Sequence, residues 1–356
     1  MKRLYLLLLI LSEICVGASA APVWHDASEF PVYGKISDAT NNRYERLPGY
    51  LEGKCRKPVW NLGRNSAGLY IRFKAETMAV YVRWTPLFDN HMNHMTDTGI
   101  KGLDLYALSD ENGWRFYRSA RPTGKENEVR LVVGRQEREF MLYLPLYDGL
   151  ASLEIGVDED GSIMQPEIES PLTSKPIIMY GSSILQGGCA SRPGMAHTNI
   201  LSRRLDREVI NLGFSGNGLL DYEIAELMAS HKDPGLFVLD YVPNPTAEVI
   251  EAKGERFFRI LRDAHPDVPV VFVELPNGPT MLFDKGAERI FTQKNAAQRQ
   301  LYEKLKKAGE KKIHYVETGD MIGSDGEATV DGTHFTDLGM IRYVDHILPV
   351  IMKALK

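Results

Sequence analysis

Four short segments carry residue types that could act together in nucleophilic catalysis. A Gly-Ser-Ser-Ile run at 181–184 places hydroxyls at a tight glycine turn, and Asp331 precedes His334 by three residues. An Asp at this spacing can fold back to accept the imidazole Nδ1 proton, which leaves Nε2 free as a general base. Between them lie a glycine-rich run at 211–218 and the side-chain amide of Asn244. Each segment alone is commonplace, because serines in such turns usually cap helices. Their joint occurrence is what points to acyl chemistry.

The second half of the chain supplies elements that would bring these segments together. Short apolar runs occupy Ile177–Tyr180, Val209–Leu212, Leu236–Asp240, Val268–Val273 and Ile313–Val316. Amphipathic stretches occupy Thr198–Leu205, Leu220–Ser230, Ala247–Ala264, Lys294–Ala308 and Asp337–Leu355. Strands that are apolar on both faces and alternate with helices predict a doubly wound parallel α/β sheet. Ligands bind at the carboxyl ends of such strands, which is where three of the four segments fall.

The first half has a different pattern, with short alternating runs separated by turn-forming residues. The runs are Leu69–Phe73, Ala79–Trp84, Trp114–Tyr117, Val129–Val133 and Phe140–Leu144. No long helical period interrupts them. Alternation of this kind predicts an all-β sandwich. We therefore expect an N-terminal β domain over residues 21–172 and an α/β domain over residues 173–356.

Composition narrows the class of partner. The 356 residues are 44% hydrophobic and carry a formal net charge of −5, without a run of Lys and Arg. This balance argues against nucleic acid or an anionic membrane surface as the main partner. No stretch after the N-terminus reaches 18 apolar residues, so no integral membrane segment is expected. A small or neutral substrate fits this chain better.

The first twenty residues are predicted to be a signal peptide. Two cations precede the apolar run Leu4–Ile10, and small residues end at Ala20, where cleavage is expected. We expect export to the periplasm or the exterior. Lipidation at Cys15 is disfavoured because Glu13 and Ile14 stand where small residues are usual.

Disulfide and metal chemistry are weakly indicated. Cys55 and Cys189 remain in the mature chain. They could form a disulfide, but two separate buried thiols are favoured. Neither cysteine lies in a CxxC pair. His91, His94 and Asp97 have spacing that could hold a metal but lack a clear fourth ligand. We expect no metal site there.

The four segments together resemble the SGNH (GDSL-type) hydrolases over residues 174–356. The resemblance makes Ser183 the nucleophile, His334 the base and Asp331 its orienting partner. It assigns the oxyanion hole to the Ser183 and Gly216 backbone N–H groups and the Asn244 amide. No metal or cofactor is required by this chemistry. The family is flavodoxin-like in fold, in agreement with the strand pattern.

Two features depart from the family pattern. Ser182 stands at the usual aspartate position, and prolines flank Asn244 at positions 243 and 245. The first should alter the hydrogen bonding of the turn without removing the nucleophile. The second could place the Asn244 amide differently.

The first half carries a second resemblance. Gly102, Asp104, Leu105 and Tyr106 match the Gly-x-Asp-Leu-Tyr signature of a β-rich domain that precedes SGNH hydrolases in secreted bacterial proteins. The match implies a jelly-roll-like accessory domain over about residues 25–170.

These resemblances imply a secreted serine esterase that removes a short acyl group, most simply acetyl, from an acylated small molecule or a glycan. A lipase or phospholipase-like esterase is the alternative within the class, and a noncatalytic glycan-binding protein is the alternative outside it. The complete Ser-His-Asp set argues against a pure binder.

Five further residues are candidate substrate contacts. Asn93 and His94 lie in a Met- and His-rich loop that could reach across the domain boundary to line the pocket. Cys189 follows the nucleophile closely and could shape the acyl pocket, as could Arg192. Tyr241 could face the pocket or fill the core.

Overall fold

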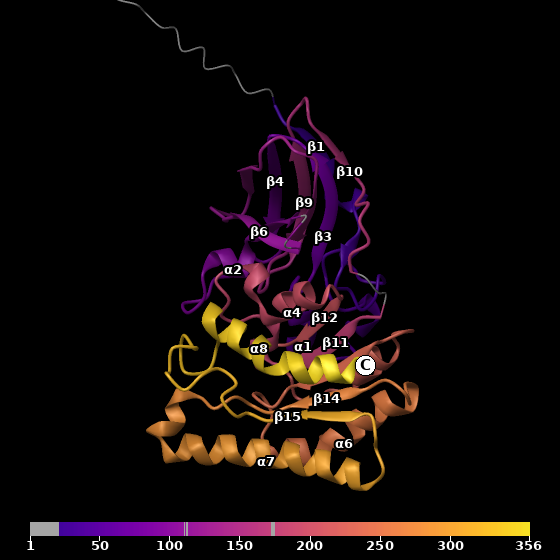
Figure 1. The fold of residues 1–356 in the computed structure, drawn as a ribbon, viewed down its shortest axis with the longest axis vertical. Helices are drawn as coiled ribbons and strands as arrows, with labels where there is room; N and C mark the ends of the chain where they lie inside the picture. The colour runs from indigo at the N-terminus through magenta and orange to yellow at the C-terminus, as the bar shows by residue number, and fades with distance from the viewer. Residues whose placement is uncertain (1–20, 110, 112, 172–174) are drawn as a thin grey trace, which may run out of the picture.

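A computed structural model describes residues 21–109, 111, 113–171 and 175–356. The expected signal peptide lies outside this range. Figure 1 shows a β-rich part at the top and an α/β part below it, with the C-terminus on the lower part. Within the described residues, no helix combines the length and the apolar character needed to cross a membrane.

The β-rich part consists of two antiparallel sheets, as the alternating runs predict. One has the order β1-β9-β4-β7, and the other β10-β3-β8-β5-β6 with β2 beside β3. Apolar side chains facing inward from both sheets form one core, which includes Phe73, Trp84 and Phe140. The strands are β1 (Val23–Asp26), β2 (Val32–Tyr33), β3 (Tyr70–Glu76), β4 (Ala79–Pro86), β5 (Leu103–Ser109), β6 (Gly113–Ala120), β7 (Asn127–Val132), β8 (Arg138–Tyr143), β9 (Leu150–Val157) and β10 (Ser162–Met164).

This part also contains short helices that the sequence patterns do not reveal. They are η1 (Ala27–Glu29), η2 (Gly49–Leu51), α1 (Lys57–Gly63) and α2 (Asp97–Lys101). One or two turns are too short to show a helical period. Helix α2 nevertheless has a local start signal, because the Thr96 hydroxyl accepts a hydrogen bond from the Gly99 N–H.

The α/β part is a five-stranded parallel sheet with the order β12-β11-β13-β14-β15. This is the flavodoxin-like order, which confirms the prediction. The strands are β11 (Ile177–Gly181), β12 (Val209–Gly213), β13 (Leu236–Asp240), β14 (Val270–Val273) and β15 (Ile313–Val316). The helices are α3 (Ser183–Gln186), η3 (Pro193–Met195), α4 (His197–Leu205), α5 (Tyr222–Ala229), α6 (Ala247–Ala264), η4 (Pro279–Leu282), α7 (Lys285–Lys307) and α8 (Asp337–Ala354).

Helices cover both faces of this sheet. Helices α4 and α8 lie on the face toward the β-rich part, and α6 and α7 on the opposite face (Figure 1). Helix α7 begins nine residues before the expected Lys294. Its buried residues begin only at Ala297, so its first turns present no apolar stripe that a periodicity argument could detect. Asp284 instead caps these turns by accepting bonds from Gly286 and Ala287.

The two parts share a core rather than only touching. Val59 and Trp60 of α1 belong to the apolar cluster that includes Ile210 and Leu212 of β12. Arg46, only 1% exposed, donates from Nη1 to the carbonyl oxygens of Asn211 at 3.0 Å and Gly213 at 2.9 Å. Burial lowers the pKa of Arg46 to about 9. A residue of the first half thus completes the hydrogen bonding of a strand in the second.

Candidate active site

The turn that carries Ser183 is built at the carboxyl end of β11, which lies between β12 and β13 in the sheet. Strand β11 ends at Gly181, where an added Cβ would lie 2.4 Å from the Asp240 carbonyl oxygen, so only glycine fits. Ser182 is the N-cap of α3, and its hydroxyl accepts a bond from the Ile184 N–H at 3.3 Å. Ser183 is therefore the first helical residue, held at the carboxyl edge of the sheet. The serine at the usual aspartate position serves as a helix cap.

Ser183, His334 and Asp331 form a continuous hydrogen-bonded chain. Ser183 Oγ lies 2.9 Å from His334 Nε2, and His334 Nδ1 lies 2.7 Å from Asp331 Oδ2. A carboxylate can only accept, so Nδ1 carries the proton and Nε2 accepts the Ser183 O–H. This is the tautomer that a general base requires.

Asp331 is suited to remain ionised in this arrangement. Its Oδ1 accepts backbone N–H bonds from His334 at 2.8 Å and Thr333 at 3.0 Å. Burial raises the pKa of Asp331, but the bonds from His334 and Thr333 outweigh it and hold the pKa below its usual value. The charged carboxylate therefore orients the imidazole through Nδ1.

Asn244 and the glycines of the second segment lie beside the nucleophile turn. Asn244 Oδ1 accepts a bond from the Gly218 N–H at 2.9 Å, which leaves the donor end of the amide pointing away from Gly218. Gly216 has φ +67°, so its backbone needs glycine. Gly218 makes the closer approach, since an added Cβ would lie 2.6 Å from the Gly181 carbonyl oxygen. The sequence pattern did not single out Gly218, although its glycine-rich surroundings were the available signal.

A loop of the β-rich part reaches the catalytic histidine. The His94 and His334 ring centroids are 5.3 Å apart, and His94 Nδ1 lies 3.1 Å from Asn93 Oδ1. The loop hypothesised from its Met- and His-rich composition thus brings His94 and Asn93 to the entrance of the site. Contact of either residue with substrate stays a prediction.

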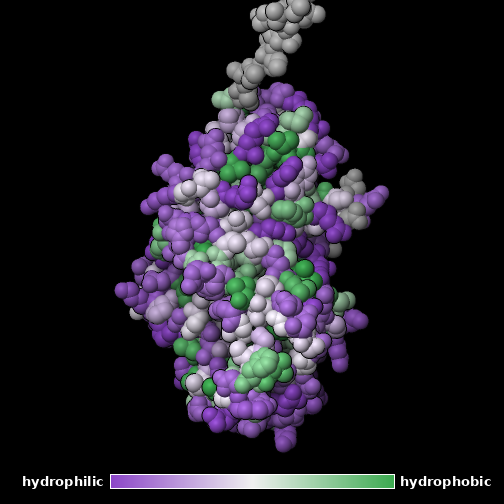
Figure 2. All heavy atoms as spheres, turned by 90° about the vertical axis from the view of Figure 1, so that its left-hand side faces the viewer, coloured by the Kyte–Doolittle hydropathy of each residue, from purple (hydrophilic) through white to green (hydrophobic). Residues whose placement is uncertain are grey.

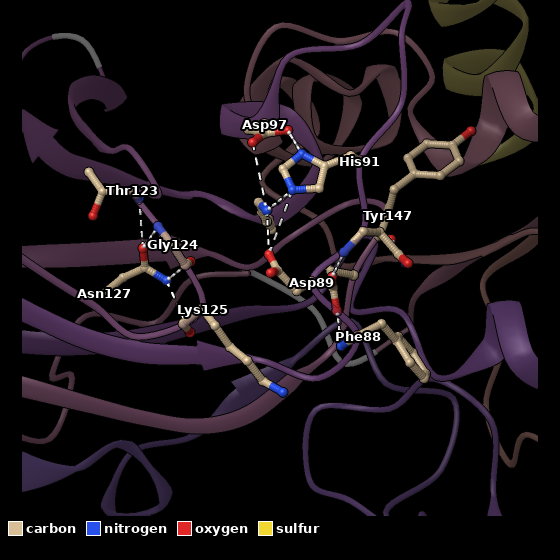
Figure 3. Close-up of polar contacts among 12 residues, drawn as sticks. Phe88, Asp89, His91, Asp97, Thr123, Gly124, Lys125, Asn127 and Tyr147 are labelled. Atoms are coloured by element: carbon tan, nitrogen blue, oxygen red, sulfur yellow. Dashed lines mark hydrogen bonds and ion pairs between the residues drawn. The ribbon is translucent and has the colours of Figure 1, made fainter.

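Three neighbouring loop residues, Asp89, His91 and Asp97 (Figure 3), contact the buried side chain of Lys101. Lys101 is 2% exposed, and its Nζ contacts Asp89 Oδ1 and, at 3.0 Å, His91 Nε2. His91 Nδ1 in turn lies 3.0 Å from Asp97 Oδ1. His91 and Asp97 therefore bind Lys101 and each other, and do not join His94 in the ligand set that their spacing suggested.

Tyr147 and Asp148 tie the same loop to the nucleophile turn. The Asp148 carboxylate accepts bonds from the Phe88 N–H at 2.9 Å and the Asn90 N–H at 2.8 Å. The Asn90 amide donates to the Tyr147 carbonyl at 2.8 Å, and the Tyr147 hydroxyl donates to the Ser183 carbonyl at 3.0 Å. Sequence analysis missed both residues, because their partners are distant in the chain.

The Gly-x-Asp-Leu-Tyr signature lies at the boundary between the two parts. Asp104 is fully buried, and its Oδ2 accepts bonds from Arg192 Nη1 and the Gly194 N–H, both at 2.8 Å. Burial raises the pKa of Asp104, and the Arg192 charge opposes that rise. Arg192 also donates to the Tyr106 hydroxyl at 2.8 Å. Arg192 thus joins the two parts and is the N-cap residue of η3, and its contact with an acyl group stays a prediction.

Cys189 and Tyr241 have different environments. Cys189 is a free thiol, 6% exposed, and its N–H donates to the Phe335 carbonyl at 3.0 Å next to His334. Burial, with the Asp331 charge, raises the pKa of the thiol to about 12. Tyr241 is fully buried and donates to Gln298 Oε1 at 2.6 Å, so it fills the core and the expectation of a pocket contact is wrong. Cys55 is also a free, buried thiol.

A cavity of about 290 Å³ lies beside the Asp331–His334 turn. The loops that follow β14 and β15 line it, with Asn277, Glu288 and Asp320 among its polar groups. Gly278 in its wall closely approaches the turn, since an added Cβ would lie 3.0 Å from the Gly332 carbonyl oxygen. The cavity therefore adjoins the Asp331–His334 turn.

Family models match both parts of the chain. The GDSL-like lipase/acylhydrolase family model matches residues 174–352, and a model of the N-terminus of SGNH-hydro-type esterases matches residues 22–163. A comparison with curated protein sequences gives no significant match.

Solved structures share the whole arrangement. A crystal structure described as a GDSL-like lipase from Bacteroides ovatus is 36% identical, with a TM-score of 0.89 over 94% of this chain and 98% of that one. The salicylyl-acyltransferase SsfX3 from a tetracycline biosynthetic pathway gives 15% identity and a TM-score of 0.75 over 93% and 97%. A family two carbohydrate esterase from Cellvibrio japonicus gives 14% and 0.54 over 81% and 89%. The last two show likeness of fold alone. From the matched family model and the Bacteroides relative, the chain belongs to the GDSL-like lipase/acylhydrolase family.

Proposed function

We propose that the protein is an exported serine esterase that removes short acyl groups, chiefly acetyl, from carbohydrates. The observation that carries this proposal is the Ser183–His334–Asp331 chain, with its 2.9 Å and 2.7 Å bonds. Ser183 Oγ attacks the ester carbonyl while His334 Nε2 takes its proton. His334 then delivers that proton to the leaving alcohol, and water repeats the sequence to release the acid. The oxyanion is met by the Ser183 and Gly216 N–H groups and the Asn244 amide.

The close walls around Ser183 favour a short acyl group. Cys189, Leu185 and Tyr147 are buried members of one apolar cluster beside the nucleophile. An added Cβ at Gly188 would lie 2.6 Å from the Tyr147 hydroxyl oxygen, so the backbone at Gly188 packs tightly against Tyr147. Close packing next to Ser183 supports a short acyl group such as acetyl.

The surroundings of the site favour a polar alcohol. The cavity beside the Asp331–His334 turn has carboxylates and an amide in its lining that a sugar could contact, together with apolar side chains such as Met281 and Leu282. Figure 2 shows the face that carries α2 and the segment before α8 as a mixture of polar and apolar residues. A lipid substrate would favour a broad apolar surface there. The fold shared with carbohydrate esterases and the signal-like N-terminus agree with a glycan substrate outside the cytoplasm.

Hydrolysis of p-nitrophenyl esters tests the proposal. We expect acetate to be cleaved faster than butyrate and octanoate, and Ser183→Ala to lower kcat roughly 10⁶-fold, as loss of a catalytic serine does elsewhere. Ser182→Ala is the matched control, because it removes the neighbouring hydroxyl and only the helix cap. Equal activity in Ser183→Ala would disprove the nucleophile assignment, and preference for octanoate would favour the lipase alternative. Acetate release from acetylated polysaccharides, lost in Ser183→Ala, tests the carbohydrate.

A protein that only binds glycans remains the alternative of another class. It would show glycan affinity with no release of acid from any ester. The intact hydrogen-bonded triad weighs against it.

A further inference from the structure

Three side chains with metal-binding atoms gather at the mouth of the site. One ligand atom each from His94, Cys189 and His334 lies within 4.8 Å of the others. The three residues come from separate segments, one in the β-rich part and two in the α/β part. The site mechanism uses only His334, so the other two have no assigned role in the reaction.

The ligand types suit a borderline-soft divalent ion. Two imidazole nitrogens and one thiolate match the His and Cys ligands of zinc sites, where Zn–N is about 2.0–2.1 Å and Zn–S about 2.3 Å. Tetrahedral ligand atoms at those lengths are about 3.3–3.8 Å apart. Movement of about 1 Å, within reach of the partly exposed His94 side chain, closes the set. Mg²⁺ and Ca²⁺ prefer oxygen ligands and would not fit.

Both imidazoles already have the partners that metal-bound histidines usually have. His334 Nδ1 donates to the Asp331 carboxylate at 2.7 Å, and His94 Nδ1 lies 3.1 Å from the acceptor Oδ1 of Asn93. A carboxylate or carbonyl oxygen on Nδ1 fixes the tautomer and leaves Nε2 unprotonated for a metal. The backbone bond from Cys189 to Phe335, 3.0 Å long, holds the thiol beside this pair.

We propose that His94, Cys189 and His334 form an inhibitory site for Zn²⁺ or a similar transition-metal ion. The ion takes the His334 Nε2 lone pair that otherwise accepts the Ser183 O–H, so metal binding and activation of the nucleophile exclude each other. The Cys189 S–H bond breaks as the sulfur–metal bond forms, and its proton passes to solvent. Water completes the coordination. The inhibition rests on the proposed esterase function, whereas the binding does not.

Cobalt spectroscopy on the metal-free full chain tests binding without relying on activity. Co²⁺ bound to a thiolate gives a charge-transfer band in the near ultraviolet, which we expect in the wild type and in Ser183→Ala, since that variant keeps all three ligands. The band should vanish in Cys189→Ser and persist in Cys55→Ser, the other free buried thiol. Loss of a residue that only supports a metal ligand typically weakens metal binding about 10–100-fold. His94→Ala removes a ligand itself, so it should weaken Co²⁺ binding at least tenfold. His25→Ala is its control. A wild type without the band would overturn the proposal, as would a band retained in Cys189→Ser.

Inhibition of p-nitrophenyl acetate hydrolysis tests the consequence. Zn²⁺ should inhibit the wild type, a chelator should restore the rate, and Mg²⁺ should have no effect. Each variant is compared with its own metal-free rate, and the inhibition constant should rise at least tenfold in His94→Ala and Cys189→Ser but not in their controls. Equal inhibition of Cys189→Ser and Cys55→Ser would overturn the proposed site. If the wild type lacks esterase activity but shows the cobalt band, the proposed function fails and the metal site stands.

Discussion

At the scale of residues, the Asp331–His334 turn is held by hydrogen bonds within its own four residues. Three bonds converge on the Asp331 carboxylate within four residues of sequence, two from backbone N–H groups and one from the imidazole. Its orientation therefore depends little on the rest of the molecule. Because its pKa is held below the usual value, the carboxylate stays charged as the pH falls through the mildly acid range.

Asp331→Asn tests the role of the carboxylate charge, because the substitution removes the charge and nearly keeps the shape of the side chain. The amide can keep the turn bonds through its oxygen but presents an N–H to His334 Nδ1, which favours the wrong tautomer. A comparable change in a serine protease lowers kcat about 10⁴-fold, and we expect a loss of that order with little change in KM. Steady-state kinetics with p-nitrophenyl acetate measure it. Asp325→Asn, on a carboxylate that binds Arg342, is the control. Retention of most activity would show that Asp331 does not orient the base.

At the scale of elements, the Gly-x-Asp-Leu-Tyr signature acts on the segment that follows the nucleophile. Asp104 at the start of β5 holds Arg192 and Gly194, and the Thr96 hydroxyl before α2 donates to the Ser191 carbonyl at 2.7 Å. Cys189 lies at the beginning of this segment. The signature is therefore explained by contact with the hydrolase half and not by a requirement of the β sandwich alone.

Asp104→Asn should loosen residues 189–196 more than the remainder of the chain. The substitution leaves Arg192 beside an amide, and breaking a buried ion pair typically costs about 3–5 kcal/mol. Amide hydrogen exchange should rise in this segment, with a fall in kcat/KM. Asp158→Asn is the control, because that carboxylate binds Thr77, Ala79 and Tyr81 within the β-rich part. If both variants raised exchange equally at 189–196, the signature would have no specific effect there.

At the scale of the whole molecule, the two halves should unfold together. Arg46 donates to four backbone carbonyls, two in each half. All four tryptophans lie in the first half, so their fluorescence follows that half while helical circular dichroism follows mainly the second. We expect the two signals to change at one denaturant concentration.

Arg46→Met should lower that shared midpoint. A buried acceptor left without a partner costs about 1–3 kcal/mol, and four lose theirs here, so the free energy of unfolding should fall by about 4 kcal/mol or more. Arg130→Met is the control, since Arg130 binds Tyr81 within one sheet. Separate fluorescence and dichroism transitions in the wild type would contradict the shared core.

The sequence predicted the parts of the structure that depend on local residue patterns. Strand β13 and helix α6 have the expected bounds because buried strands and amphipathic helices leave a period in the chain. The Asp331 and His334 contact was also predictable, as it spans three residues. The Tyr147 bond to Ser183 was not, because it joins segments that only the fold brings together. The contacts of Lys101 were not predictable either, because contacts within an irregular loop leave no periodic pattern in the sequence. The sequence left open whether Tyr241 faces the pocket or fills the core, because burial of a strand-end side chain has no local signal.

The buried Asp104–Arg192 pair also limits how such proteins can be recombined. A chimaera joined near residue 172 would take Asp104 from one parent and Arg192 from the other. If the second parent had no cation there, an unpaired carboxylate would be enclosed at the junction. Exchange of the first half between relatives should therefore succeed when the second parent also carries a cation at position 192, or when residues 188–196 are exchanged together with the first half.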